Sequence, residues 1–84
     1  MKKSCFVYIL LCADDTYYTG YCVDLDQRIK QHNEGKGAKY TRSRGPVSLA
    51  YSETCTSKSE AMKREAAIKK LSRKEKTLLI TTGT

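Results

Sequence analysis

No stretch of this 84-residue sequence approaches the about 20 consecutive apolar residues that a membrane-spanning helix needs, so we expect no membrane span. No C-x-x-C pair occurs among the four cysteines, which argues against a zinc site of the usual spacing. Internal repeats and low-complexity segments are also lacking. Three of the cysteines lie in apolar, strand-like runs, so we expect all four to be reduced core residues of a cytoplasmic protein: Cys5, Cys12, Cys22 and Cys55.

The N-terminal residues imitate a secretory signal peptide, because Lys2 and Lys3 precede the apolar run CFVYILLCA. The run is short and contains aromatic residues, however, and no small-residue cleavage site stands before Cys12. We therefore interpret it as a β-strand.

Positive charge is concentrated in two segments. The chain has 16 Lys and Arg against nine Asp and Glu, a net charge of +7. Residues 27–44 carry six basic side chains and one acidic side chain, and residues 57–76 carry eight and three, so each segment has a local charge of +5. Residues 1–26 have a local charge of −2. This distribution predicts a polyanionic partner, nucleic acid above all, although a merely soluble, well-solvated surface is the simpler alternative.

The pattern of elements predicts one α+β domain over residues 1–84, with a core from about 4 to 80. Three strands form an antiparallel sheet flanked by helices in the order ββα(α)βαα. Helix starts are indicated by capping residues at Asp24, Ser57 and Ser72. The strands are expected at 5–12, 17–22 and 47–55, the first of them central, and the helices at 25–34, 38–42, 58–71 and 73–81.

Two arrangements of the first hairpin remain open. A three-residue loop at 14–16 gives opposed residues whose numbers add to thirty and places Tyr8 on the same face as Tyr18 and Gly20. A two-residue loop places Tyr8 with Tyr17 and Tyr21 instead. Either arrangement gathers tyrosines on one face of the sheet.

The predicted helices add polar residues to apolar stripes. In the helix at 25–34, His32 shares a stripe with Leu25 and Ile29, and Arg28 stands at its edge. A satisfied core histidine and an Arg with a buried stem are the structural alternatives. In the helix after Ser57, residues Ala61, Met62 and Ile68 define the apolar side, and Glu65 projects between them. An exposed pair of Glu65 with Lys69 is the alternative there.

The ordered set Tyr8, Tyr18-x-Gly20, Arg28, His32 and Glu65 resembles the GIY-YIG nuclease superfamily over about residues 4–80. The small, uncharacterised single-domain bacterial members are the most similar. Phe6 and Val7 replace the Gly and Ile of the first motif. The Asn that often follows the Glu helix is absent from Ser72–Lys76, and so is a targeting domain, so a protein partner that supplies target choice is expected.

This resemblance implies a metal-dependent endonuclease that cleaves DNA phosphodiester bonds, with branched, damaged or otherwise non-B DNA as expected substrates. Glu65 would hold one Mg²⁺ or Mn²⁺ ion, weakly without substrate. Arg28 would clamp the scissile phosphate, Tyr8 would position or deprotonate the attacking water, and Tyr18 would orient it. A non-catalytic nucleic-acid-binding module on the same scaffold is the alternative.

The general base is the demanding part of this mechanism. A tyrosine with a pKa near about 10 is only about 0.1% ionised at pH 7, so its use as a base costs about 4 kcal/mol unless a cation lowers its pKa. His32 is the alternative base, because histidine titrates near pH 6.5. Gly20 allows a close approach of backbone or phosphate, or else marks a bulge.

Basic residues next to these motifs are expected to contact phosphates, with Tyr40 stacking on a base. They lie in the two basic segments: Lys36, Lys39, Arg42 and Arg44, then Lys69, Lys70, Arg73 and Lys74. Contacts of this kind carry little sequence information, so the predicted binding is salt-sensitive and poorly selective.

Overall fold

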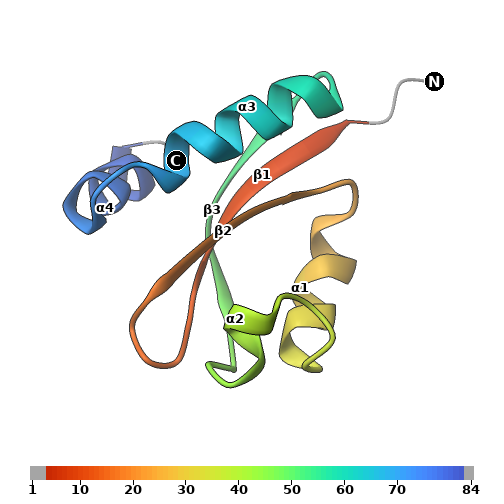
Figure 1. The fold of residues 1–84 in the computed structure, drawn as a ribbon, viewed down its shortest axis with the longest axis vertical. Coiled ribbons are helices and arrows are strands. Elements are labelled where there is room, and N and C mark those ends of the chain that lie inside the picture. The colour runs from red at the N-terminus through yellow and green to blue at the C-terminus, as the bar shows by residue number, and fades with distance from the viewer. Residues whose placement is uncertain (1–3, 83–84) are drawn as a thin grey trace.

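The computed structural model describes residues 4–82, which form three strands and four helices (Figure 1). The predicted order of elements is confirmed, and the boundaries fall within two residues of those expected. In chain order the elements are β1 (Cys5–Leu11), β2 (Tyr17–Cys22), α1 (Leu25–Asn33), α2 (Lys39–Arg42), β3 (Ser48–Cys55), α3 (Lys58–Lys69) and α4 (Arg73–Thr82).

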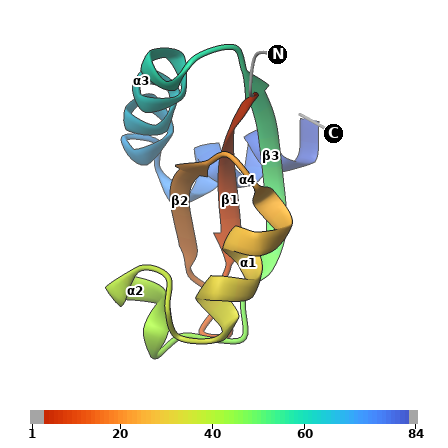
Figure 2. The same ribbon diagram turned by 90° about the vertical axis from the view of Figure 1, so that its right-hand side faces the viewer.

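The sheet is antiparallel with the strand order β2-β1-β3, so the apolar β1 is central as predicted (Figure 2). In the hairpin, Tyr8 lies opposite Gly20, and Leu10 lies opposite Tyr18. The numbers of opposed residues add to 28, so the loop is longer than in either of the two arrangements that the sequence left open. Because this shift from thirty is an even number, Tyr8 still shares a face with Tyr18 and Gly20, as one of the two arrangements predicted.

A wider hairpin loop explains the shift. The Cys12 amide donates to the Thr16 carbonyl at 2.8 Å, and the Asp15 amide donates to the Cys12 carbonyl at 2.9 Å, so the turn closes outside the paired strands. Asp15 adopts a φ of 66°, a conformation that Asp tolerates better than most residues. The loop therefore takes five residues, 12–16, between the last β1–β2 pair.

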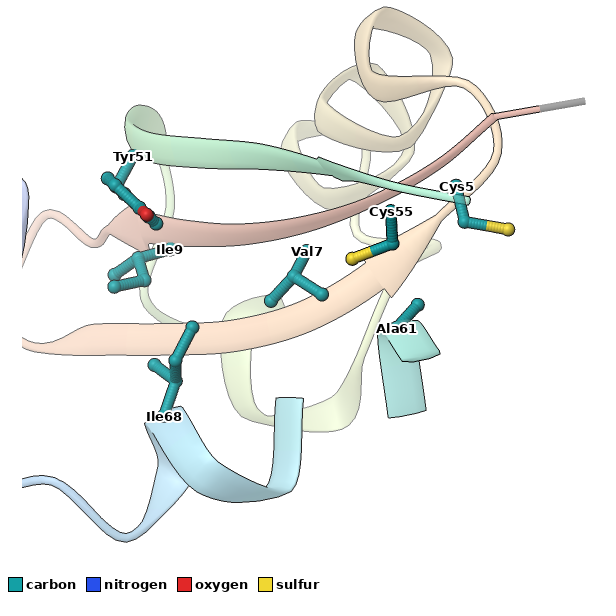
Figure 3. Packing of buried hydrophobic residues seen from close by; sticks show 7 residues of the cluster. All are labelled: Cys5, Val7, Ile9, Tyr51, Cys55, Ala61 and Ile68. Atoms are coloured by element: carbon teal, nitrogen blue, oxygen red, sulfur yellow. The ribbon is translucent and has the colours of Figure 1, made fainter. Parts of the chain in front are cut away.

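One face of the sheet packs against α3 and α4 and is apolar (Figures 1 and 3). Val7 and Ile9 of β1 meet Ala61 and Ile68 of α3, and all four are fully buried. Met62 is 49% exposed, so its predicted place on the apolar side of α3 was wrong. At about 100° per residue, Ala61 and Ile68 lie about 20° apart on the helix, whereas Met62 is turned about 100° away from Ala61.

The opposite face is covered by α1 and contains Tyr8, Leu10, Cys12 and Val47. Asp24 caps α1 by accepting the Gln27 amide at 3.1 Å, as the sequence predicted. The helix ends in a Schellman motif, in which the Lys36 amide donates to the Gln31 carbonyl at 2.8 Å and Gly35 adopts a φ of 77°. This ending turns the chain back across the C-terminal turn of α1.

The predicted capping residues of the last two helices are also confirmed. Ser57 accepts the Glu60 amide at 3.1 Å. Ser72 and Glu75 form a reciprocal capping box, in which the Glu75 amide donates to Ser72 Oγ at 3.2 Å and the Ser72 amide donates to Glu75 Oε1 at 2.9 Å. The box ends α3 and starts α4, so the two helices are separate elements.

Two arginines hold the hairpin loop from opposite sides of the sheet. Arg44, which follows α2, lies 3.0 Å from the Asp14 carboxylate. Arg73, the first residue of α4, lies 3.3 Å from the Asp15 carboxylate and stacks over the Tyr17 ring at 4.7 Å. The loop therefore joins the α2 side of the molecule to the α4 side.

Candidate functional site

A buried cluster of polar side chains lies between β1 and α1. Tyr8 Oη lies 3.1 Å from His32 Nε2, and Arg28 Nε donates to Tyr8 Oη at 3.4 Å. Arg28 and His32 are one turn apart on α1, as the sequence predicted, and both approach the same phenol oxygen. The side chains of Tyr8 and His32 are each 1% exposed, whereas Arg28 is half-buried.

Gly20 makes room for the Tyr8 ring. A Cβ at position 20 would lie 2.6 Å from Tyr8 Oη and 2.8 Å from Tyr8 Cζ, well inside contact distance. The β1–β2 register is continuous at this pair, so no bulge explains the glycine. The group that approaches Gly20 is the tyrosine ring of the first motif, and not the backbone or phosphate that the sequence analysis expected.

Two residues that the sequence analysis did not single out hold the other side of His32. Thr41 Oγ1 lies 2.7 Å from His32 Nδ1. A Cβ at Gly37 would lie 2.4 Å from the same nitrogen, so only glycine fits there. Gly37 stands in the run GKGAKYT just after α1, and the second glycine of that run was the available signal.

Tyr18 lies on the open side of the cluster. Its ring centroid is 6.5 Å from that of Tyr8, 5.3 Å from that of His32 and 5.8 Å from that of Tyr40, on which it stacks. Arg44 Cζ also lies over the Tyr40 ring, at 4.0 Å from its centroid. Tyr40 therefore already packs against an aromatic ring and a guanidinium within the molecule, while 38% of the residue stays exposed.

Burial sets the protonation states in the cluster. It raises the pKa of Tyr8, and the hydrogen bond and charge of Arg28 only partly oppose this change. Burial and then the charge of Arg28 lower the pKa of His32. The pKa of Tyr18 is also raised by burial, with Arg28 lowering it and Glu65 raising it. At neutral pH the resting site therefore contains neutral tyrosines, neutral His32 and cationic Arg28.

Glu65 comes from α3, whose apolar side packs on the other face of the sheet. The carboxylate nevertheless lies close enough to the edge strand β2 for its charge to act on Tyr18. Its side chain is 21% exposed and lies 3.9 Å from Lys69 Nζ, so the predicted pair with Lys69 is present. No cluster of three or more His, Cys, Asp or Glu side chains suited to a metal ion occurs within residues 4–82.

The basic residues that were predicted to contact phosphates differ in whether they already pair with acidic or aromatic side chains of this chain. Arg44 and Arg73 are paired with Asp14 and Asp15 and are stacked on tyrosines, so their charges are partly compensated within the molecule. Lys69 faces Glu65. The other basic residues that the sequence predicted to contact phosphates are exposed: Lys36, Lys39, Arg42, Lys70 and Lys74.

Across the described part of the chain, no helix is long and apolar enough to cross a membrane.

Comparison with known proteins assigns the chain to a family. The GIY-YIG catalytic domain model matches residues 4–78. A UPF0213 protein of Halobacterium salinarum is 56% identical over 73 residues, which are 87% of this chain and 95% of that protein. A UPF0213 protein of Staphylococcus epidermidis is 54% identical over 78 residues, covering 93% and 95% of the two chains.

Two solved structures resemble the whole fold. The solution NMR structure of a UPF0213 protein from Bacillus halodurans has 51% sequence identity and a TM-score of 0.60, covering 93% of this chain and 83% of that one. That of a protein from E. faecalis has 46% identity and a TM-score of 0.65, covering 96% and 86%. The antiparallel sheet, the Tyr8–Gly20 contact and the domain match together identify the chain as a member of the GIY-YIG catalytic domain family.

Proposed function

We propose that this protein is a metal-dependent endonuclease that hydrolyses DNA phosphodiester bonds, with a preference for branched or otherwise non-B DNA. The observation that carries the proposal is the hydrogen-bonded cluster of Tyr8, Arg28 and His32, with Tyr18 at its open side. A phenol beside both a guanidinium and a neutral imidazole can accept a proton from water and pass one on.

The proton transfer in this reaction is a relay. The attacking water gives a proton to Tyr8 Oη, Tyr8 gives its own hydroxyl proton to His32 Nε2, and the water oxygen bonds to phosphorus as the bond to the leaving oxygen breaks. In water a full transfer from tyrosine to histidine costs about 4.8 kcal/mol, since their ordinary pKa values differ by about 3.5. The raised pKa of Tyr8 and the lowered pKa of His32 increase that cost at rest. The relay is therefore concerted with attack.

Arg28 couples the binding of a phosphate to the access of water to the Tyr8 hydroxyl. Its hydrogen bond to Tyr8 is 3.4 Å long, the longer of the two that the phenol oxygen makes, and its side chain is half-buried. A phosphate that binds the guanidinium draws Arg28 away from Tyr8 and opens a path to an oxygen that is otherwise closed to water. The same cation offsets charge that develops on the phosphate during attack.

Glu65 fits the role of the one protein ligand to Mg²⁺ or Mn²⁺. Its oxygens are of the hard type that these ions take, and Mg²⁺ sites commonly combine one or two carboxylates with substrate phosphates and water. Bound there with substrate, the ion supplies charge stabilisation for the leaving oxygen. In the free protein Glu65 instead faces Lys69. Occupancy of this site therefore depends on substrate.

The exposed lysines and Arg42 supply contacts to the DNA backbone that do not read sequence. These residues lie in or next to α2 and at the junction of α3 and α4. Because contacts to the DNA backbone do not read its sequence, the choice of target is left to DNA shape or to a protein partner. Nothing in this proposal requires a membrane, and a cytoplasmic location suits a DNA substrate.

A cleavage assay on supercoiled, flapped and junction DNA with Mg²⁺ or Mn²⁺ tests the proposal. We expect Tyr8→Phe to lower turnover by about 10²- to 10⁴-fold, the usual contribution of proton transfer. Tyr17→Phe is the matched control, because the Tyr17 hydroxyl contacts Thr77 on the opposite side of the sheet. Glu65→Gln should abolish the metal-dependent cleavage, whereas Glu60→Gln on the same helix should leave it unchanged. Equal activity of Tyr8→Phe and Tyr17→Phe would contradict the proposal.

A non-catalytic DNA-binding module is the second candidate, and the closure of Tyr8 and His32 to water favours it. In that case all variants bind DNA, none cleaves, and Glu65→Gln binds as well as the unmodified chain or better. Charge reversal at Arg42 weakens binding under either function, so it does not discriminate between them.

A further inference from the structure

Both ring nitrogens of the buried His32 have hydrogen-bonding partners. The tautomer of the neutral ring decides which nitrogen can accept a proton, and therefore from which neighbour. On one side Nε2 lies 3.1 Å from Tyr8 Oη. On the other side Nδ1 lies 2.7 Å from Thr41 Oγ1 and 3.4 Å from the Ala38 amide nitrogen. A neutral imidazole has one N–H, so only one of the two nitrogens can accept a proton from a neighbour.

The neutral ring carries its proton either on Nδ1 or on Nε2, and the two forms differ in whether each neighbouring hydroxyl hydrogen has an acceptor. The Thr41 hydroxyl donates to the Ala38 carbonyl at 3.0 Å, which leaves the Thr41 oxygen free to accept from Nδ1–H. Nε2 then accepts the Tyr8 hydroxyl, and each buried hydroxyl hydrogen has an acceptor. With the proton on Nε2 instead, Tyr8 Oη would receive two donors, His32 and Arg28, and among the described residues no other acceptor contacts the Tyr8 hydroxyl hydrogen.

The cost of the first arrangement is small. It gives up only the 3.4 Å contact from the Ala38 amide, the longest and therefore the weakest of those around the ring. The second arrangement gives up the 3.0 Å bond from Thr41 to the Ala38 carbonyl and leaves a phenol that is 1% exposed without an acceptor. A buried polar group without a partner is the more costly of the two losses.

We infer that Thr41 is a positioning residue that holds His32 in the Nδ1–H tautomer, with Gly37 fixing the ring against it, so that Nε2 accepts the Tyr8 proton. Gly37 contributes by having no side chain, since any Cβ there would push the ring from its place. The assignment of the tautomer stands on hydrogen-bond geometry alone, and its catalytic meaning rests on the proposed function.

The test uses the single histidine of the chain, because a ¹⁵N-labelled sample of the whole, untagged protein gives only one set of imidazole signals. Two-bond ¹H–¹⁵N correlation spectra at about pH 8 report the tautomer of the neutral ring directly. We expect Nδ1 at the shift of a protonated nitrogen and Nε2 at the shift of an unprotonated one. The reverse assignment would overturn the inference without any need for an active enzyme.

Variants test the role of Thr41. Thr41→Val removes the acceptor at nearly constant shape and should shift the imidazole signals towards a mixture of tautomers, whereas Thr41→Ser should keep the original pattern. Tyr8→Phe should keep Nδ1 protonated as well, because Thr41 remains. A pure Nδ1–H spectrum in Thr41→Val would contradict the role given to Thr41. If Thr41→Val does not fold, the unmodified chain still tests the tautomer, and Thr41→Ala, which also lacks the hydroxyl, tests the role of Thr41 in its place.

Cleavage data separate this inference from the proposed function. If the protein cleaves DNA, Thr41→Val should lower kcat by about 10- to 100-fold with little change in KM, as is typical for groups that orient a functional histidine, and Thr41→Ser should restore it. The Nδ1–H tautomer without cleavage would overturn only the proposed function. Cleavage with the Nε2–H tautomer would overturn only the inference.

Discussion

The central strand is buried on both faces of the sheet, but different interactions hold the two faces together. Val7 and Ile9 point to a face where the neighbours are aliphatic side chains, thiols and the ring of Tyr51 (Figure 3). Tyr8, between them on the same strand, points to a face where a guanidinium and an imidazole meet its hydroxyl. Strand alternation thus separates the residues that stabilise the domain from those available for chemistry.

The largest effect on stability is expected from the apolar face. Ile68→Ala removes a fully buried side chain between α3 and the sheet, and should lower the free energy of unfolding by about 2–5 kcal/mol. Urea denaturation followed by circular dichroism measures this change. If the proposed cleavage occurs, its rate per folded molecule should stay the same, because Ile68 packs in the apolar cluster and not in the cluster that contains Tyr8. Loss of specific activity in fully folded Ile68→Ala protein would show that the two faces are not separable.

A smaller effect on stability, with a larger effect on the site, is expected at Gly20. In Gly20→Ala the new Cβ would lie 2.6 Å from Tyr8 Oη, so the phenol must leave its position between Arg28 and His32. We expect a loss of about 1–3 kcal/mol, typical of an overpacked interior, and a change in the imidazole signals of His32. Gly45→Ala is the control, since nothing lies within 4 Å of a Cβ there and the change should stay within about 0.5 kcal/mol. Unchanged His32 signals in Gly20→Ala would contradict this interpretation.

The smallest expected effect is a dependence of stability on pH that arises from the polar face alone. The pKa of the buried His32 is lowered by burial and by Arg28, below its ordinary value of about 6.5. As the pH falls through the window below 6.5, the unfolded chain binds a proton that the folded chain does not, so the free energy of unfolding decreases. Above pH 6.5 this contribution is fully present.

Denaturant titrations at closely spaced pH values between about 7 and 4.5 measure that decrease, and His32→Gln should remove it. The carboxylates whose pKa values are lowered, Asp14 and Glu75, begin to act only near the acid end of this range, so the decrease between about pH 7 and 5.5 reports His32. An identical pH dependence in the unmodified protein and in His32→Gln would show that the imidazole is not the group responsible.

Local signals in the sequence predicted most of the fold. The capping residues Asp24, Ser57 and Ser72 predicted three helix starts. Each cap accepts a hydrogen bond from the backbone amide three residues later, so the whole interaction is local in the sequence. The central position of β1 followed from its uninterrupted apolar run. The hairpin register matches neither of the two that the sequence left open, because the loop includes Asp15 in a left-handed backbone conformation that composition alone does not reveal.

The site was only partly predictable, for a related reason. Tyr8, Tyr18, Arg28 and His32 follow from strand alternation and helical periodicity, which are local. Thr41 and Gly37 reach His32 only because the Schellman motif at Gly35 turns the chain back over α1. Such a return path depends on one backbone angle, and no periodicity in the residues after Gly35 encodes it.

The hairpin loop has a consequence for how the protein can be modified. Exposed loop tips are usually the safest places to insert a tag, a fluorophore or a cut in the chain. Here the neighbours Asp14 and Asp15 each receive an arginine, one from the segment after α2 and the other from the start of α4. An insertion between them would spread these two anchors apart and disturb both sides of the sheet together. The junction between α3 and α4 at Ser72 meets its own capping needs locally, so a probe attached to the exposed side chain at position 70 should leave the fold undisturbed, although it would replace one of the lysines proposed to contact DNA.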